Sequence, residues 1–182
     1  DKLPYRPERK YELFDPAELM LGRLIEFWEA FNPADYVVLR GMHALMKSDM
    51  LSSHREFHEE ATIACFIALD ASFSKVQQEL INSGYRNPSA HDVAKWVHTN
   101  FNAPFGVAEP GPDDRYFGDL YEQRVMTLHP SSRYGEIPVA PLFYGDCMWL
   151  RRDLREMFAY LLTGRHGADY QEDLRLSVGS AP

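Results

Sequence analysis

The chain has 182 residues, of which 45% are hydrophobic and 25% charged, and this composition suits one globular domain with a sizeable core. Its formal net charge of -8 excludes a broadly basic surface and disfavours nonspecific binding to DNA or RNA. No stretch reaches the roughly 18 consecutive apolar residues of a membrane-spanning helix, and no signal-peptide pattern is present. A soluble, cytoplasmic protein is therefore expected.

The N-terminal part carries two helix signals. The spacing of apolar residues predicts a first helix that starts at Asp15, with Leu24 and Trp28 on one face. Residues 32–35 contain Pro and Asp, which end this helix and start a second one that runs to about Ser48. The short link predicts that the two helices form a hairpin.

A longer helix is expected next. Ser53 and Glu56 have the spacing of a capping box, in which each side chain bonds to a free backbone N–H at a helix start. The helix should run to about Asn82 and end at Gly84. Because residues 61–69 are apolar nearly all round, this segment is the expected central core helix.

A shorter helix follows and leads into a loop. Ser89 and Asp92 form a second capping-box pattern, and apolar residues continue at helical spacing to Phe101. The Pro and Gly residues between 104 and 112 then predict a loop.

The C-terminal half predicts two more helices. One starts near Asp114 and should stop at His129, because a residue that precedes proline is disfavoured in the α conformation. An irregular stretch over 131–144 separates it from a last amphipathic helix that ends at Gly164. Residues 165–182 are expected to be a loose polar tail.

These patterns together predict an all-α fold, a compact bundle of about six helices in one domain over residues 1–164. No internal repeat, coiled-coil heptad series or alternating strand pattern of useful length is visible. The connection over 131–144 exceeds the roughly two to eight residues that usually join helices in bundles. Long ordered loops of this kind often shape a functional site.

The strongest functional signal is the pair Arg124 and His129. Arg124 interrupts an apolar helical stripe, and a buried guanidinium needs either an acidic partner or a bound anion. A guanidinium matches two phosphate oxygens, and an imidazole exchanges a proton near neutral pH. The pair can therefore act on a phosphodiester. The alternative is structural: Arg124 pairs with a core acid such as Asp70, and His129 only ends the helix.

An Arg followed a few residues later by a His, late in a compact helical domain, resembles the signature of the HEPN superfamily, many members of which are metal-independent endoribonucleases. Here the matching residues are Arg124 and His129. The resemblance implies a HEPN-like core over about residues 53–164, extended by the N-terminal helical hairpin. It also implies a homodimer in which two Arg/His pairs face one cleft.

The resemblance implies RNA cleavage by attack of the ribose 2′-hydroxyl on the adjacent phosphate. His129 would act as general acid or base, and Arg124 would stabilise the developing charge. Ser131, Ser132 and Arg133 add donors that suit phosphate binding. No metal and no cofactor are expected. Other members of the superfamily are noncatalytic binding or toxin-neutralising modules, so a protein-interaction or toxin-antitoxin role is the alternative function.

A metal site is a third possibility. His54 and His58 are four residues apart, a spacing that places two ligands on one face of a helix. The metalloprotease pattern needs Glu directly after the first His, and Arg55 stands there instead. A solvated helix start is the favoured interpretation.

Two further groups are expected to be structural. Cys65 and Cys147 each lie among apolar residues, so they are interpreted as small core side chains with no disulfide framework and no metal. Arg151, Arg152 and Arg155 are interleaved with acidic residues and are interpreted as a solvated helix face.

Overall fold

The computed structural model describes residues 25–108 and 144–179. The chain divides into two units, residues 1–32 and residues 33–182, and each is described by itself. Residues 25–30 of the first unit are helical, and the described elements of the second unit are all helices, which confirms the predicted all-α fold. No helix in the described ranges is both long and apolar enough to cross a bilayer. The single-domain boundary at residues 1–164 stays a prediction.

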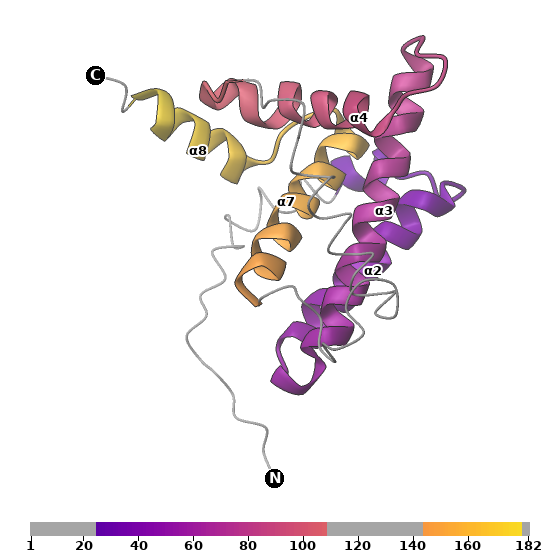
Figure 1. Ribbon diagram of the computed structural model, residues 1–182, viewed down its shortest axis with the longest axis vertical. Coiled ribbons are helices and arrows are strands. Elements are labelled where there is room, and N and C mark those ends of the chain that lie inside the picture. Colours follow the sequence, from indigo (N-terminus) through magenta and orange to yellow (C-terminus); the bar gives the residue numbers. More distant parts are fainter. Residues whose placement is uncertain (1–24, 109–143, 180–182) are drawn as a thin grey trace. The chain divides into compact units, whose positions relative to one another are not determined.

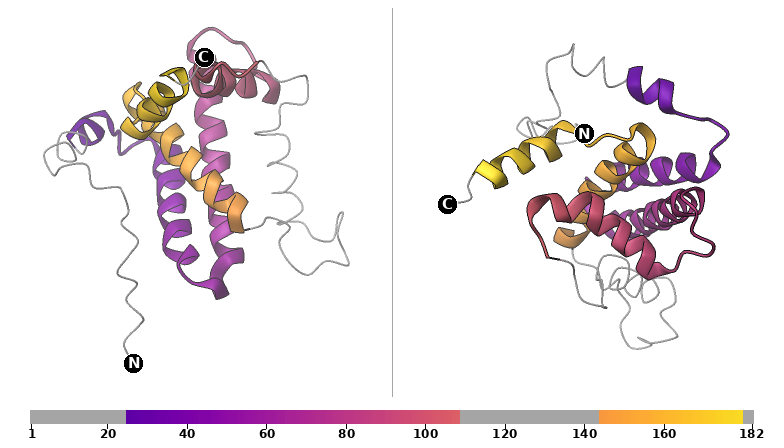
Figure 2. Two further views of the ribbon diagram at one scale, coloured as in Figure 1. Left: turned by 90° about the vertical axis from the view of Figure 1, so that its left-hand side faces the viewer. Right: turned by 90° about the horizontal axis from the view of Figure 1, so that it is seen from above.

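Helices α2 (Tyr36–Ser52) and α3 (His58–Asn82) lie side by side and form the most extensive helix pair of the second unit (Figures 1 and 2). Asp35 starts α2, because its Oδ1 accepts a hydrogen bond from the Val38 N–H at 3.1 Å. Its other oxygen, Oδ2, lies 2.9 Å from Lys75 Nζ on α3. One carboxylate thus caps α2 and links it to its neighbour.

The link between α2 and α3 corrects one prediction. Ser53 does not cap the long helix; it is the last residue associated with α2, with φ -69° and ψ -14°. A 3-10 turn over Arg55–Phe57 follows, and α3 begins at His58 with no side-chain cap. An N-cap needs a non-helical backbone, so a Ser in the α conformation cannot act as one. The predicted end of α3 near Asn82 is correct, and Gly84 has φ 101°.

Helix α7 (Tyr144–Thr163) packs against both α2 and α3 and completes the core. Its fully buried side chains include Leu154 and Met157. A side chain at Gly41 of α2 would overlap the ring of Phe158, which shows how closely α7 approaches the α2 backbone. The helix ends before Gly164 (φ 69°), where the sequence predicts its end.

Helix α4 (Ala90–Val97) begins with the predicted capping box, since the side chains of Ser89 and Asp92 each bond to the other's backbone N–H. The chain continues as a π-helical turn over His98–Asn102, labelled η2, and a short 3-10 turn, η3 (Ala103–Phe105). The apolar spacing to Phe101 thus predicts helical structure correctly, but it does not predict the change from an α-helix to a π-helical turn at His98.

The expected loose tail contains helix α8 (Ala168–Gly179). Figures 1 and 2 show it beside the segment formed by α4 and η2. The helix is mostly polar, so its own sequence carries little hydrophobic signal. Aromatic contacts at its first turn hold it, as described below.

Candidate functional site

The predicted catalytic residues Arg124 and His129 lie outside the described residues, as do the predicted phosphate-binding residues Ser131, Ser132 and Arg133. Their roles stay predictions. The suggested structural partner of Arg124, Asp70, lies on α3 and is partly buried, and its backbone carbonyl accepts a hydrogen bond from Ser74. Pairing between Asp70 and Arg124 is likewise a prediction.

The geometry required for a metal site at His54 and His58 is not present. His54 has an extended backbone (φ -123°, ψ 119°) before the 3-10 turn, whereas His58 is the first residue of α3. The two imidazoles therefore do not share one helix face. Over residues 25–108 and 144–179, no cluster of three or more His, Cys, Asp or Glu side chains is placed to hold a metal ion.

Arg151 is buried, with a relative exposure of 6%, so the prediction of a solvated face is wrong at this residue. Its Nη1 donates a hydrogen bond to the Ser48 carbonyl oxygen at 3.2 Å, and its Nε lies 3.6 Å from Asp49 Oδ1. The same carboxylate accepts hydrogen bonds from Arg155 Nη2 at 2.6 Å and Nε at 3.3 Å. Among the described residues, two guanidinium groups therefore share one carboxylate.

Cys147 lies one turn before Arg151 on α7 and belongs, with Cys65 of α3, to the buried core cluster. Both cysteines are free, and both are buried, as the sequence predicts. The neighbouring Cys65 thiol lowers the pKa of Cys147 most, and Thr62 and the charge of Arg151 lower it less, against the opposing effect of burial. The Cys147 thiol, together with burial, raises the pKa of Cys65.

Two hydroxyl groups, those of Ser48 and Thr62, border this thiol pair. Ser48 Oγ donates to the Ala61 carbonyl at 2.7 Å, and Thr62 Oγ1 donates to the His58 carbonyl at 2.8 Å. Because each hydroxyl has a single proton, neither can donate fully to the Cys147 sulfur as well. The Cys65 thiol is therefore the main neighbour that lowers the pKa of Cys147.

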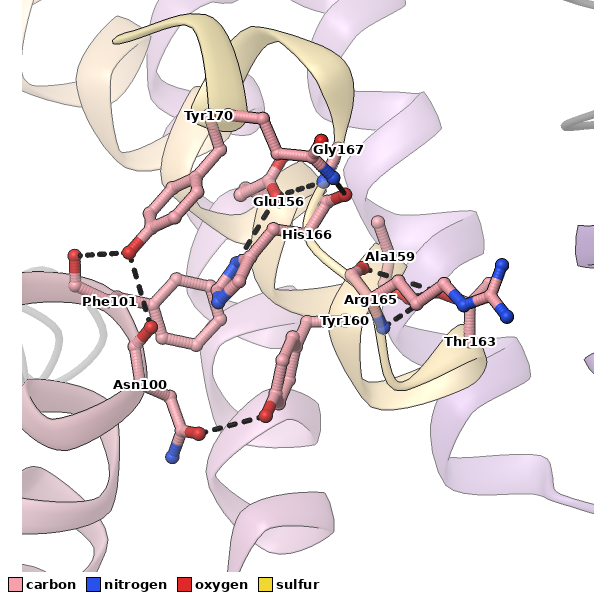
Figure 3. Close-up of polar contacts among 11 residues, drawn as sticks. Asn100, Phe101, Glu156, Ala159, Tyr160, Thr163, Arg165, His166, Gly167 and Tyr170 are labelled. Carbon is pink, nitrogen blue, oxygen red and sulfur yellow. Dashed lines mark hydrogen bonds and ion pairs between the residues drawn. The ribbon is translucent and has the colours of Figure 1, made fainter. Parts of the chain in front are cut away.

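A second cluster surrounds His166, between α7 and α8 (Figure 3). The His166 ring stacks on Tyr170 with centroids 3.9 Å apart, and lies 4.6 Å from the ring of Tyr160. The Phe101 ring meets it edge-on at 5.0 Å. Glu156 Oε1 lies 3.6 Å from His166 Nδ1, too far for a hydrogen bond, and accepts one from the backbone N–H that follows His166.

Hydrogen bonds from tyrosine hydroxyls tie this cluster to η2 (Figure 3). Tyr170 Oη donates to the backbone carbonyls of Asn100 and Phe101, at 3.2 Å and 3.0 Å. Tyr160 Oη donates to Asn100 Oδ1 at 2.8 Å. Asn100 and Phe101 lie in the last turn of η2, and the last backbone carbonyls of a helix lack intrahelical donors, so they can accept side-chain donors. These contacts attach α8 to η2 and α7, and the cluster is called the aromatic joint below.

The sequence patterns described above do not indicate this joint. The sequence does contain a hint, since Tyr160 and Tyr170 lie on either side of His166 and Gly167. Helical periodicity does not connect the two tyrosines, because the helix breaks between them. No family model, no curated protein and no solved structure matches this chain.

Proposed function

We propose that this protein is a HEPN-like helical module that cleaves RNA without a metal ion. Arg124 stabilises charge on the phosphate, and His129 transfers the proton of the attacking 2′-hydroxyl. The observation that carries the proposal is the sequence arrangement of an Arg within an apolar stripe and a His placed before Pro130, in a chain whose described elements are all helices. Ser131, Ser132 and Arg133 supply further phosphate donors.

The test is a cleavage assay on a mixed RNA pool with a chelator present. Wild-type protein should cut RNA, and Arg124→Ala and His129→Ala should each lower the rate by at least about a hundredfold, the usual size of a general acid-base contribution. Arg86→Ala and His91→Ala change exposed residues of the same types and are matched controls. Full activity in either site variant, or activity that disappears with chelator, contradicts the proposal.

A second candidate function, a noncatalytic interaction module, is favoured by the surface of α2. Five large apolar side chains are exposed on it; one is Val37, and the other four, Tyr36, Leu39, Met46 and Met50, have exposures of 78%, 40%, 63% and 72%. Their spacing of three, seven and four residues follows the a and d positions of a heptad. Such a stripe pairs with the same stripe on a symmetry-related helix, so the proposed occupant is a second copy of this chain.

Light scattering after size exclusion tests this pairing. The wild-type protein should be a dimer, and the double variant Met46→Glu/Met50→Glu should be a monomer, because paired carboxylates in an apolar seam are costly. Met148→Glu on α7 changes another exposed Met, 41% accessible, and is the control. A dimer without RNA cleavage favours the interaction module. A wild-type monomer contradicts the pairing and removes the shared cleft that the ribonuclease proposal implies.

A further inference from the structure

We propose that the two α2 helices of the dimer run parallel and in register, so that His43 lies against the His43 of the second copy, and that protonation of this histidine pair separates the copies. This inference rests on the pairing of α2 proposed above and adds its orientation and its control by pH. It uses described residues of α2 and does not depend on Arg124 or His129.

His43 interrupts the apolar stripe of α2 at its centre. The seven-residue step from Leu39 to Met46 passes over one a position of the heptad, and His43 occupies it. Its side chain is exposed, like the apolar side chains on each side of it. A polar residue at an a position lowers the stability of a helix pair but selects one register and one number of chains. An imidazole at this place therefore indicates a specific alignment of two copies.

The charged residues beside the stripe favour a parallel orientation. Arg40 and Lys47 occupy e positions of the heptad, and both are exposed. In an antiparallel pair the e positions of the two helices face each other, so Arg40 of one copy would lie near Lys47 of the other and repel it. In a parallel pair each e position faces a g position, and Arg40 lies beside Asp35 of the second copy. The parallel orientation replaces a repulsion with an attraction.

The two g positions suit these cations. The Asp35 carboxylate caps α2 and lies 2.9 Å from Lys75 Nζ, but the side chain keeps 24% exposure and can face a further cation. The other g position holds Met42, which is partly buried. The aliphatic stem of Lys47 can cover this side chain while its ammonium group stays in water.

A parallel pair in register places each a position against the same position of the second copy. The two His43 rings then meet on the two-fold axis, between the layers formed by Leu39 and by Met46. Two neutral imidazoles can share one hydrogen bond, because the N–H of one ring donates to the unprotonated nitrogen of the other. Protonation of both rings removes this acceptor and puts two positive charges in contact.

The surroundings of His43 add to this repulsion. On α2 its charged neighbours are Arg40, three residues before, and Lys47, four residues after. Helices α3 and α7 pack against the face of α2 that carries Val38 and Leu45, so the groups that face His43 belong to α2 and to its copy. The dimer therefore binds fewer protons than two separate chains. Association is favoured at high pH and weakens as the pH falls through the range in which histidine titrates.

Cysteine cross-linking of the full chain tests the orientation. Tyr36→Cys and Met50→Cys change the two ends of the stripe and are each treated with a mild oxidant. A disulfide needs Cα atoms within about 7 Å, so each variant should form a cross-linked dimer by itself in a parallel pair. In an antiparallel pair the two copies of either end lie far apart, so a dimer that cross-links at neither end overturns the proposal. Met148→Cys, 41% exposed on α7, and the wild type, whose cysteines are buried, are the controls.

Light scattering at about pH 8 and about pH 5.5 tests the histidine pair. The dissociation constant of the wild-type dimer should rise at least about tenfold at the lower pH, because like charges are then in contact. His43→Leu completes the apolar stripe and should stay dimeric at both pH values. His91→Leu changes an exposed imidazole of α4 and should keep the wild-type response.

The outcomes separate this inference from the pairing on which it rests. A wild-type protein that is monomeric at the higher pH overturns both. A wild-type dimer with the same dissociation constant at the two pH values keeps the pairing and overturns the histidine control. The same conclusion follows if His43→Leu dissociates with acid as the wild type does.

Discussion

The two polar clusters of the second unit differ in their chemical groups and in how far they are buried. The cluster of Asp49, Cys147 and Arg151 lies between α2, α3 and α7, with its cysteine and Arg151 removed from water. The His166 cluster lies where α7, α8 and η2 meet, and its His166 side chain retains 20% exposure. In the first cluster a buried guanidinium is compensated by a carbonyl and a carboxylate. In the second, aromatic rings surround one imidazole and hold the helices together.

The comparison shows that a buried charged group requires stronger compensating interactions than a buried aromatic ring, because its desolvation costs more free energy. A buried arginine loses hydration and is tolerated only with compensating partners, which Arg151 has in the Ser48 carbonyl and the Asp49 carboxylate. An imidazole between tyrosine rings gains dispersion and edge contacts at little electrostatic cost. Each cluster can be perturbed separately, because they share no residue.

Removal of the buried charge is expected to have the largest effect on stability. Arg151→Ala leaves the Ser48 carbonyl without its donor and removes the packing of the long side chain, at a cost of about 3 kcal/mol. Arg152→Ala, on the exposed side of the same helix, should stay within about 0.5 kcal/mol of the wild type. Equal effects of the two variants would show that Arg151 is hydrated in solution.

The smallest effect should come from the aromatic joint. Tyr170→Phe keeps the ring that stacks on His166 but loses the hydrogen bonds to Asn100 and Phe101, which should cost about 1 kcal/mol. Hydrogen exchange should localise the change to α8, whose amides become less protected while those of α3 do not. Protection lost evenly over all helices would contradict the division into two independent clusters.

The sequence by itself determined the helical class and several helix ends. The all-α fold, the end of α3 before Gly84, the Ser89 capping box and the end of α7 before Gly164 depend on local signals that a few adjacent residues contain. The same local reasoning was wrong at Ser53, which is the C-cap of α2 and has an α-helical backbone, so it cannot start the next helix.

Only the tertiary structure decided which residues meet. Cys65 and Cys147 are far apart in the chain, and nothing in their local sequences indicates that they join one buried cluster or that Arg151 is buried. Helix α8 forms where the sequence predicts a loose tail, because Tyr170 finds its partners on η2 and not within its own segment. Helix periodicity is a property of neighbouring residues, whereas a buried cluster or an aromatic joint depends on contacts that only the packing of separate helices creates.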